Sequence, residues 1–431
     1  MHTQLFKGMS SLKIRSLSVD VGQMPTGWAI LVIVLLSCMV KFAYIVAFGG
    51  GLANFPTEGS DAVFYDSAAR VILKSGVYGL SQEQPITVMP PGQSFFLAAL
   101  YLISNGSIAF AKLAHMLLLT SAAILVYFTG KTIARASVGF GAAVLTAIDP
   151  AQAYLSGTFL SEPLFIFLTT LAIYLILLSI RNQKSSSGYL YLISAGICFA
   201  AAGLTRNQGW LFPIFIFVCA LFTRGRIISV KSSLVILLVT TALIAPWTYR
   251  NYRVSGHFII VSSEGGLTLW ACNNPEFRYR SPAPMSQPLY QAPPGLTELE
   301  LDRYYRKKAT QWIFHHPGRF IVNGVKKILV LYHFDPMSWR TEKATLFRLG
   351  GLFPYGVVLP FIFWGILTRF RQRQLGIIVC YLLFNTLLAI LFCGDSRLRA
   401  PMQPYLYLFS IFGFFDFYSL TKFLIKKTQR R

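Results

Sequence analysis

Ionisable side chains stand at short intervals between the long apolar stretches of this sequence, and their types suit proton transfer and anion binding. Carboxylates occur at Asp61 and Asp66, and at Glu162 within the sequence SEP. The arginines that stand in similar places are Arg206 in LTRNQ, Arg250 in PWTYRNY, and Arg397 and Arg399 in GDSRLRAP, where Asp395 precedes them. Ionisable groups are costly within or beside a membrane, so a functional role is their default interpretation.

Carboxylates and arginines together suit the transfer of a sugar from a lipid phosphate. Breaking a glycosyl–phosphate bond leaves a phosphate dianion, which arginine stabilises through bidentate, charge-assisted hydrogen bonds. The acceptor hydroxyl needs a carboxylate within hydrogen-bond reach as its general base. Direct displacement inverts the anomeric carbon, whereas retention needs a second carboxylate as nucleophile. The outer face of an inner membrane lacks nucleotide sugars, so an activated donor there must be carried on a lipid.

Each of these residues also has a simpler interpretation. Asp61 suits a helix cap or the first turn of a helix, and Asp66 suits a solvated helix surface. The simpler interpretation of Glu162 is that it pairs with Arg206 or Arg397 and has no catalytic role, because acids near a bilayer often pair. Arg250 and Arg397 can reach lipid phosphates from the interface. The functional interpretation explains better why these residues gather at one face of one bundle.

The elements that position these residues must be membrane helices. Of the 431 residues, 54% are apolar and 13% are charged, whereas about 25% of residues are charged in soluble proteins. The mean hydropathy is +0.55. Apolar stretches near or above the length of about 18 residues that crosses a bilayer recur from Trp28 to Ile425. The sequence therefore predicts an all-α polytopic membrane protein and excludes a soluble enzyme, a coiled coil, a collagen and a disordered chain.

The charge balance is strongly basic, with 39 lysines and arginines against 16 acids and a net charge of +23. Much of this excess lies in short loops between apolar stretches, as the positive-inside rule requires. We therefore expect membrane lipids as partners and no nucleic acid. The six cysteines contain no CxxC pair, so neither a zinc site nor a disulfide framework is indicated. No metal or other cofactor is expected.

The basic clusters predict the topology, because each should lie in the cytoplasm. An even number of crossings between clusters gives ten spans and places both termini inside. The predicted spans are approximately 28–49, 108–129, 137–157, 160–180, 188–205, 208–223, 232–248, 350–368, 375–393 and 402–425. The two stretches 95–103 and 319–334 are interpreted as interfacial helices, since Lys326 and Lys327 would each cost about 2.5–3.5 kcal/mol at the bilayer centre. If both cross instead, the count becomes twelve.

Two long segments then lie outside, and both are predicted to contain helices. Asp61 to Leu73 has apolar residues near helical period, and Leu296 to Phe314 is also helix-like. The resulting division is a cytoplasmic N-terminus at 1–27, an N-terminal transmembrane catalytic module at 28–248 that includes the outer loop 50–107, an outer region with interfacial helices at 249–349, C-terminal transmembrane helices at 350–425, and a cytoplasmic tail at 426–431.

The order of the motifs resembles the bacterial branch of the GT-C superfamily, the polyprenyl-phosphate-sugar-dependent transferases related to protein O-mannosyltransferases and the lipid A aminoarabinose transferase. The resemblance extends from Asp61 to Pro404. Its motifs are Asp61 with Tyr65 and Ala69, MPPGQSFFLAALY from Met89, LSEPLF from Leu160, GLTRNQG from Gly203, APWTYRNY from Ala245, GGLTLWACNNP from Gly265, HHPGRFIVNGVKK from His315 and GDSRLRAPMQP from Gly394. Each pattern is weak alone, and the order on this topology makes the set fairly specific.

The resemblance implies a GT-C-like helix bundle with roles for particular residues. Asp61 would be the catalytic carboxylate of the first outer loop and Glu162 the acid of the second. Arg250 or Arg397 would bind the donor phosphate. Relatives of the mannosyltransferase type usually have Asp-Glu at the first motif, whereas Ala62 follows Asp61 here. This departure does not favour protein O-mannosylation or a metal role for a neighbouring glutamate.

The sequence thus predicts a membrane glycosyltransferase that uses a polyprenyl-phosphate sugar at the outer face of the bacterial inner membrane. Asp61 and Glu162 are the candidate catalytic residues. The donor-phosphate candidates are Arg250, Arg397, Arg399 and Arg206. The alternative from another class is a transporter or flippase of lipid-linked glycans, which commonly shows two related halves; no such similarity is found here. An O-antigen ligase-like enzyme is a further alternative. The sugar, the acceptor and the oligomeric state are not indicated.

Overall fold

The structure is a computed structural model that describes residues 25–56, 60–182, 185–277, 291–334 and 352–429. Within these ranges the chain forms helices and loops without a named strand, which confirms the all-α prediction. Eight helical segments of the described chain are long and apolar enough to cross a membrane. They are α2 (Thr26–Ala47), α5 (Ile108–Ile133), α8 (Glu162–Arg181), α9 (Ser186–Thr205), α11 (Val230–Ser255), η2 with α16 (Leu352–Gly356 and Val357–Arg369), η3 with α17 (Arg373–Leu375 and Gly376–Leu391) and α19 (Gln403–Thr428).

The remaining elements are shorter. They are α3 (Ser60–Ser75), α4 (Gly92–Ser104), α6 (Ala136–Ala147), α7 (Pro150–Ser156), α10 (Gln208–Phe222), α12 (Gly265–Ala271), α13 (Glu298–His315), α14 (Pro317–Tyr332) and α18 (Ser396–Arg399). The helices expected near 61–73, 95–103, 296–314 and 319–334 are therefore present as α3, α4, α13 and α14.

The prediction of one continuous helix over 137–157 is wrong. The chain breaks between α6 and α7, where Asp149 precedes Pro150 and accepts hydrogen bonds from the backbone N–H groups of Ala151 (2.7 Å) and Gln152 (3.2 Å). Proline has no backbone N–H to donate inside a helix, but it fits the first turn of a new helix, where that hydrogen bond is not needed. The predicted span 208–223 is α10, which has only 15 residues.

The core lies where α8, α9, α10, α17 and α19 pack together through buried aliphatic and aromatic side chains. The pair α16 and α19 approaches closely at two glycines. A Cβ added to Gly365 would collide with the backbone oxygen of Phe409, and one added to Gly413 would collide with that of Phe361. Small residues let membrane helices pack backbone to backbone, so this crossing fixes the position of α19.

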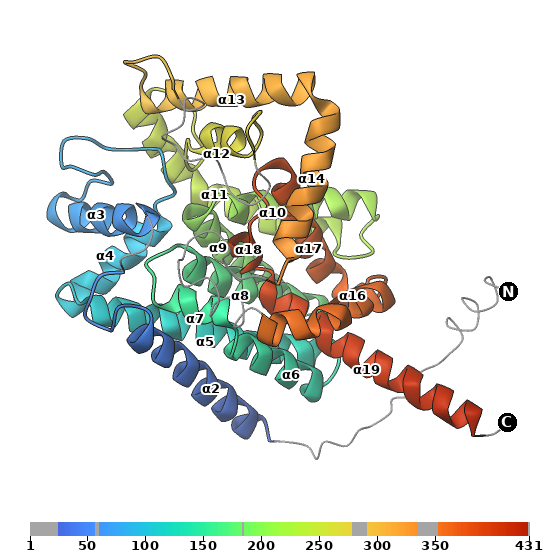
Figure 1. Cartoon of the computed structure of the whole chain (residues 1–431). Helices are drawn as coiled ribbons and strands as arrows, with labels where there is room; N and C mark the ends of the chain where they lie inside the picture. Colours follow the sequence, from blue (N-terminus) through green and yellow to red (C-terminus); the bar gives the residue numbers. More distant parts are fainter. Residues whose placement is uncertain (1–24, 57–59, 183–184, 278–290, 335–351, 430–431) are drawn as a thin grey trace.

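One end of the bundle carries most of the additional elements. In Figure 1, α13 runs across the top with α12 beneath it, and α3 and α4 lie together at the left. Thr297 and Glu300 form a reciprocal capping box that begins α13. In Figure 1 the short helix α18 lies below α12 and α13, and ion pairs of Arg397 connect it to Asp61 of α3 and to Glu162 at the start of α8. This arrangement brings residues separated by more than 300 positions to one site.

Candidate active site

Arg397 is the centre of the candidate site. It lies in α18, where the Asp395 side chain accepts a hydrogen bond from the backbone N–H of Arg397 (2.9 Å) and begins the short helix. Its guanidinium donates through Nε to Glu162 Oε1 at 2.5 Å and through Nη1 and Nη2 to Asp61 Oδ2 at 3.2 Å each. One arginine therefore bridges the two carboxylates that the sequence singled out.

Glu162 holds a second arginine at the same oxygen. Arg206 Nη1 lies 2.8 Å from Glu162 Oε1, and it also donates to Ser161 Oγ at 3.0 Å. Glu162 is the first residue of α8, and Arg206 directly follows α9. The interpretation of Glu162 as an arginine partner is thus confirmed for Arg206 and Arg397 together. We call Asp61, Glu162, Arg206 and Arg397 the polar cluster.

The members of the polar cluster differ in exposure. The side chain of Asp61 is 33% exposed, whereas that of Glu162 is 1% exposed. The arginines lie between these values, at 17% for Arg206 and 10% for Arg397. Glu162 is therefore an internal anchor for both arginines, and Asp61 is the carboxylate that a bound molecule can reach.

The charges of the polar cluster shift the pKa values of Arg397 and of the neighbouring Tyr65. Burial alone lowers the pKa of the Arg397 guanidinium, but the negative charges of Glu162 and Asp61 outweigh this effect and raise it. Arg397 therefore stays positively charged. Tyr65 lies one turn after Asp61 on α3, and its pKa is raised by burial and by the charges of Glu264 and Asp61. Its hydroxyl stays protonated and can donate a hydrogen bond at neutral pH.

Glu264 is a further carboxylate of this region that the sequence analysis missed. It immediately precedes α12. Its pKa is raised to about 7: burial is the largest cause, Arg206 lowers the pKa, and the charges of Asp61 and Asp302 raise it. A carboxyl group with a pKa near neutrality can give or take a proton under working conditions. The only sequence signal was its position directly before the GGLTLWACNNP motif.

Arg250 lies in the last turns of α11, which continues to Ser255 rather than ending near 248. Its guanidinium donates to the backbone oxygens of Ile86 at 2.6 Å and Tyr78 at 2.9 Å, and it stacks over the Trp247 ring at 4.8 Å. None of these contacts involves a member of the polar cluster. In this structure Arg250 fastens the loop between α3 and α4 to α11.

Arg399 is also engaged elsewhere. Its side chain is almost fully buried, and it donates to Gln403 Oε1 at 2.7 Å and to the backbone oxygens of Leu331 and His333. It stacks over the Tyr355 ring at 3.8 Å. These contacts connect the end of α14 to the beginning of α19. Of the four predicted donor-phosphate arginines, the structure therefore brings Arg206 and Arg397 together with the carboxylates and separates Arg250 and Arg399.

The region above the polar cluster is held together by a hydrogen bond and a disulfide that the sequence did not indicate. Asp302 of α13 accepts a hydrogen bond from the backbone N–H of Gly266, and a Cβ on Gly266 would collide with the Asp302 backbone oxygen. Cys272 and Cys393 form a disulfide across 121 positions. The expectation that the cysteines form no disulfide framework is therefore wrong for this pair. The disulfide connects the end of α12 to the loop that leads into α18.

The described residues contain no group of three or more His, Cys, Asp or Glu side chains placed to hold a metal ion. The polar cluster pairs each carboxylate with at least one arginine instead. Such a set can bind an anion at its arginines and accept a proton at its exposed carboxylate.

The chain is similar to known proteins in part of its sequence and in its fold. A family model described as dolichyl-phosphate-mannose-protein mannosyltransferase matches residues 88–249, a range that contains Glu162 and Arg206. A search among curated proteins found no match. The fold is similar to that of the oligosaccharyltransferase AglB from Archaeoglobus fulgidus in complex with an inhibitory peptide and a dolichol-phosphate. That similarity has a TM-score of 0.56 at 13% identity and covers 93% of this chain and 52% of that one.

Two other solved structures are also matched. The apo form of the same oligosaccharyltransferase gives a TM-score of 0.58 at 12% identity, covering 94% of this chain and 52% of that one. ArnT from Cupriavidus metallidurans bound to undecaprenyl phosphate gives 0.45 at 14% identity, covering 90% and 77%. The chain spans about half the length of the oligosaccharyltransferase chains. The similarity to AglB confirms the predicted fold, and the family model and AglB are both named as sugar transferases, the enzyme class predicted for this chain.

Proposed function

We propose that the protein transfers a sugar from a polyprenyl-phosphate-linked donor to an acceptor at the outer face of the bacterial inner membrane. The acceptor is a hydroxyl or amide group of a lipid, glycan or protein. The observation that carries the proposal is the bridge that Arg397 forms between Asp61 and Glu162. A guanidinium, which can bind phosphate, thus stands beside a reachable carboxylate.

The reaction needs one proton acceptor and one stabiliser of negative charge. Asp61 takes the proton from the acceptor as its oxygen or nitrogen bonds to the anomeric carbon. The bond between that carbon and the phosphate oxygen breaks, and the electron pair leaves with polyprenyl phosphate. The donor is a phosphodiester with one negative charge and the product a monoester with up to two, so Arg397 binds the leaving group more tightly than the donor. Binding that strengthens in this way accelerates the chemical step.

The geometry of Arg397 suits an exchange of partners. Its Nε is held by the buried Glu162 at 2.5 Å, whereas its two Nη groups reach the exposed Asp61 at 3.2 Å. A donor phosphate can take the Nη pair in the bidentate geometry that guanidinium favours. Asp61 is then released toward the acceptor while Glu162 keeps the arginine in place. Arg206 shares Glu162 and adds a second positive charge.

Two features support the assignment of the site to the outer face. The basic clusters at the opposite helix ends favour the cytoplasm for that side. The disulfide between Cys272 and Cys393 joins elements above the polar cluster. Disulfides form and persist in the bacterial periplasm and outside cells and are rare in the cytosol.

The proposal is tested in a strain from which the gene is deleted. Mass spectrometry compares its envelope lipids, glycans and glycoproteins with those of the parent, and we expect a species that lacks one sugar together with more of the corresponding lipid-linked sugar. The wild-type gene and the Asp66→Asn variant should restore the parent pattern, while Asp61→Asn should not. Asp66 is the matched control because it lies on the same helix but binds Arg70 and Tyr101 instead. Unchanged envelope composition, or restoration by Asp61→Asn, would contradict the proposal.

A further inference from the structure

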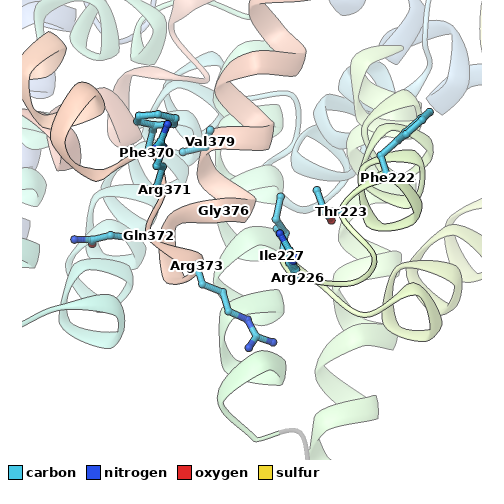
Figure 2. A pocket seen from close by; sticks show the side chains of 10 residues that line it. All are labelled: Phe222, Thr223, Arg226, Ile227, Phe370, Arg371, Gln372, Arg373, Gly376 and Val379. Carbon is cyan, nitrogen blue, oxygen red and sulfur yellow. The ribbon is translucent and has the colours of Figure 1, made fainter. Parts of the chain in front are cut away.

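A second candidate site lies at the end of α10 that is farther from Arg206. It is a cavity of about 650 Å³ between the end of α10 with the turn that follows it and the turn between α16 and α17. Figure 2 shows its lining, with side chains from these two segments on either side of Gly376. Three of them are arginines, Arg226, Arg371 and Arg373. We call this cavity the arginine pocket.

The arginine pocket is well separated from the candidate active site. Arg206 stands just before α10, and Phe222 at the end of the same helix lines the pocket. Fifteen helical residues rise about 22 Å, which approaches the thickness of the hydrocarbon core. If the polar cluster faces outside, the arginine pocket therefore lies at the cytoplasmic interface, where the positive-inside rule also places it.

The arginines of the pocket are not neutralised by acids. All three are exposed, and within the described parts of the chain no carboxylate pairs with them. Their neighbour Arg369 differs, because its Nε donates to Asp416 Oδ2 at 2.7 Å and its Nη2 to the other carboxylate oxygen. An acid thus balances the adjacent arginine, whereas the three around the cavity keep their charge for an external anion.

The rest of the lining is mainly apolar, with Thr223 and Gln372 as its other polar members. Gly376 packs closely against Ile227, where an added Cβ would lie 2.9 Å from the side chain. Phe222 is 86% exposed and Phe370 is 45% exposed, and Arg371 stacks over the Phe370 ring at 5.3 Å. Exposed aromatic rings at the interface depth suit acyl chains and glycerol backbones. The pocket therefore combines positive charge with a hydrophobic border.

We propose that the arginine pocket binds the phosphate headgroup of an anionic phospholipid from the cytoplasmic leaflet, with its acyl chains along Phe222 and Phe370. Basic pockets between membrane helices on this side suit such headgroups, and guanidinium matches their phosphate oxygens. The topology rule alone explains positive charge at this face, but it does not require that three arginines surround one cavity with aromatic walls. The proposal is independent of the reaction at the polar cluster.

The test is native mass spectrometry of the full-length protein in detergent, titrated with cardiolipin, phosphatidylglycerol and phosphatidylcholine. We expect the two anionic lipids to bind the wild-type protein more tightly than phosphatidylcholine, and millimolar inorganic phosphate to leave them bound. The Arg226→Gln, Arg371→Gln, Arg373→Gln triple variant should bind them about tenfold or more weakly, since it removes all three positive charges around the headgroup. The matched control is Arg181→Gln, which removes an exposed arginine from the end of α8 outside the cavity.

A second variant keeps the test decisive if the triple glutamine variant fails to insert. Lysine at the same three positions preserves the charge and the insertion signal but removes the planar forks, and we expect severalfold weaker binding of the anionic lipids. Wild-type affinity in both triple variants would overturn the proposal, as would equal binding of phosphatidylcholine. Displacement of the lipid by inorganic phosphate would also overturn it, by showing a site for a free anion.

Discussion

The two ends of this molecule use arginine in opposite ways. In the polar cluster each arginine is paired with a carboxylate, and the shared acid Glu162 is 1% exposed. In the arginine pocket the three guanidinium groups are exposed, and the described residues offer them no ion pair. A paired arginine must exchange partners to bind an anion and thereby frees a carboxylate. An unpaired one simply holds the anion. The first arrangement suits a reaction with proton transfer, and the second suits binding alone.

This difference also sets the tolerance of the two ends to substitution. Removing one member of a buried ion pair leaves an uncompensated charge and costs about 3–5 kcal/mol. Exposed charges contribute little to stability, because water and salt screen them. Conservative changes in the polar cluster should therefore be felt strongly, while those in the arginine pocket should alter lipid binding without altering catalysis.

The largest expected effect is that of Asp61→Asn, which keeps the shape of the side chain but removes its basicity. Loss of a general base commonly lowers the rate about 10²–10⁴-fold. Turnover by purified protein in liposomes, followed as release of polyprenyl phosphate from the donor, measures it. Arg226→Gln at the other end is the control and should stay within about twofold, since it touches no reacting group. Equal losses in both variants would erase the functional distinction between the two ends.

Arg397→Lys should have the next largest effect. Lysine keeps the charge but cannot hold Glu162 and two phosphate oxygens at once, so one or more charge-assisted hydrogen bonds are lost. A hydrogen bond to a charged group is worth about 1.5–3 kcal/mol, which corresponds to roughly 10–100-fold in kcat/KM. Rates measured against donor concentration test this. Arg371→Lys in the arginine pocket provides the comparison, and a wild-type curve for Arg397→Lys would remove this residue from the phosphate site.

A smaller effect is expected for Glu264, whose contribution to stability should depend on pH. Its folded-state pKa is about 7, above the value of about 4.3 for an exposed glutamate, so the folded protein retains a proton that the unfolded chain has lost. The stability from this group is complete below about pH 4, falls as the pH rises toward 7, and is then constant. Glutamine does not titrate. The unfolding temperature of Glu264→Gln relative to wild type should therefore rise by about 2–4 °C between about pH 4.5 and 8.

The same scan of Asp66→Asn controls for general effects of carboxylate loss. A constant difference between Glu264→Gln and wild type at every pH would show that Glu264 titrates normally and would remove it from the proton balance of the cluster.

The parts of the fold that the sequence predicts are those with a local signal. Apolar length alone predicts α8 and α9 closely, and helical period predicts α3 and α13. The break at Pro150 had a signal too, an Asp-Pro pair that typically begins a new helix. The length criterion for a membrane span overrides this pair, because most of the surrounding residues are apolar.

The parts that the sequence does not predict depend on distant partners. Glu162 and Arg397 lie 235 positions apart, and hydropathy only places each at a helix end. The partners of Arg250 and Arg399 are mainly backbone oxygens, which carry no sequence signature. Glu264 stands in a polar loop, where a carboxylate is unremarkable until the fold brings Asp61 near it. Likewise, no spacing rule connects Cys272 to Cys393.

The smallest expected effect is that of Arg250→Lys, and it separates binding of the donor from support of the loop. The Arg250 guanidinium binds two backbone oxygens, those of Ile86 and Tyr78, and stacks over Trp247. Lysine retains a charge but can neither reach both oxygens in the same fork nor stack in the same way. We therefore expect a lower unfolding temperature and a loss of activity of about two- to fivefold, from less accurate placement of the loop before α4.

The dependence on donor concentration decides between the two roles of Arg250. A residue that only positions the loop lowers kcat and stability together and leaves the KM for the donor near its wild-type value. A residue that binds the phosphate raises that KM instead. Arg253→Lys is the matched control, because Arg253 lies in the same final turns of α11 and donates to the exposed Tyr249 hydroxyl rather than to the loop before α4. A raised donor KM in Arg250→Lys alone would place the phosphate at the end of α11 and extend the site beyond the polar cluster.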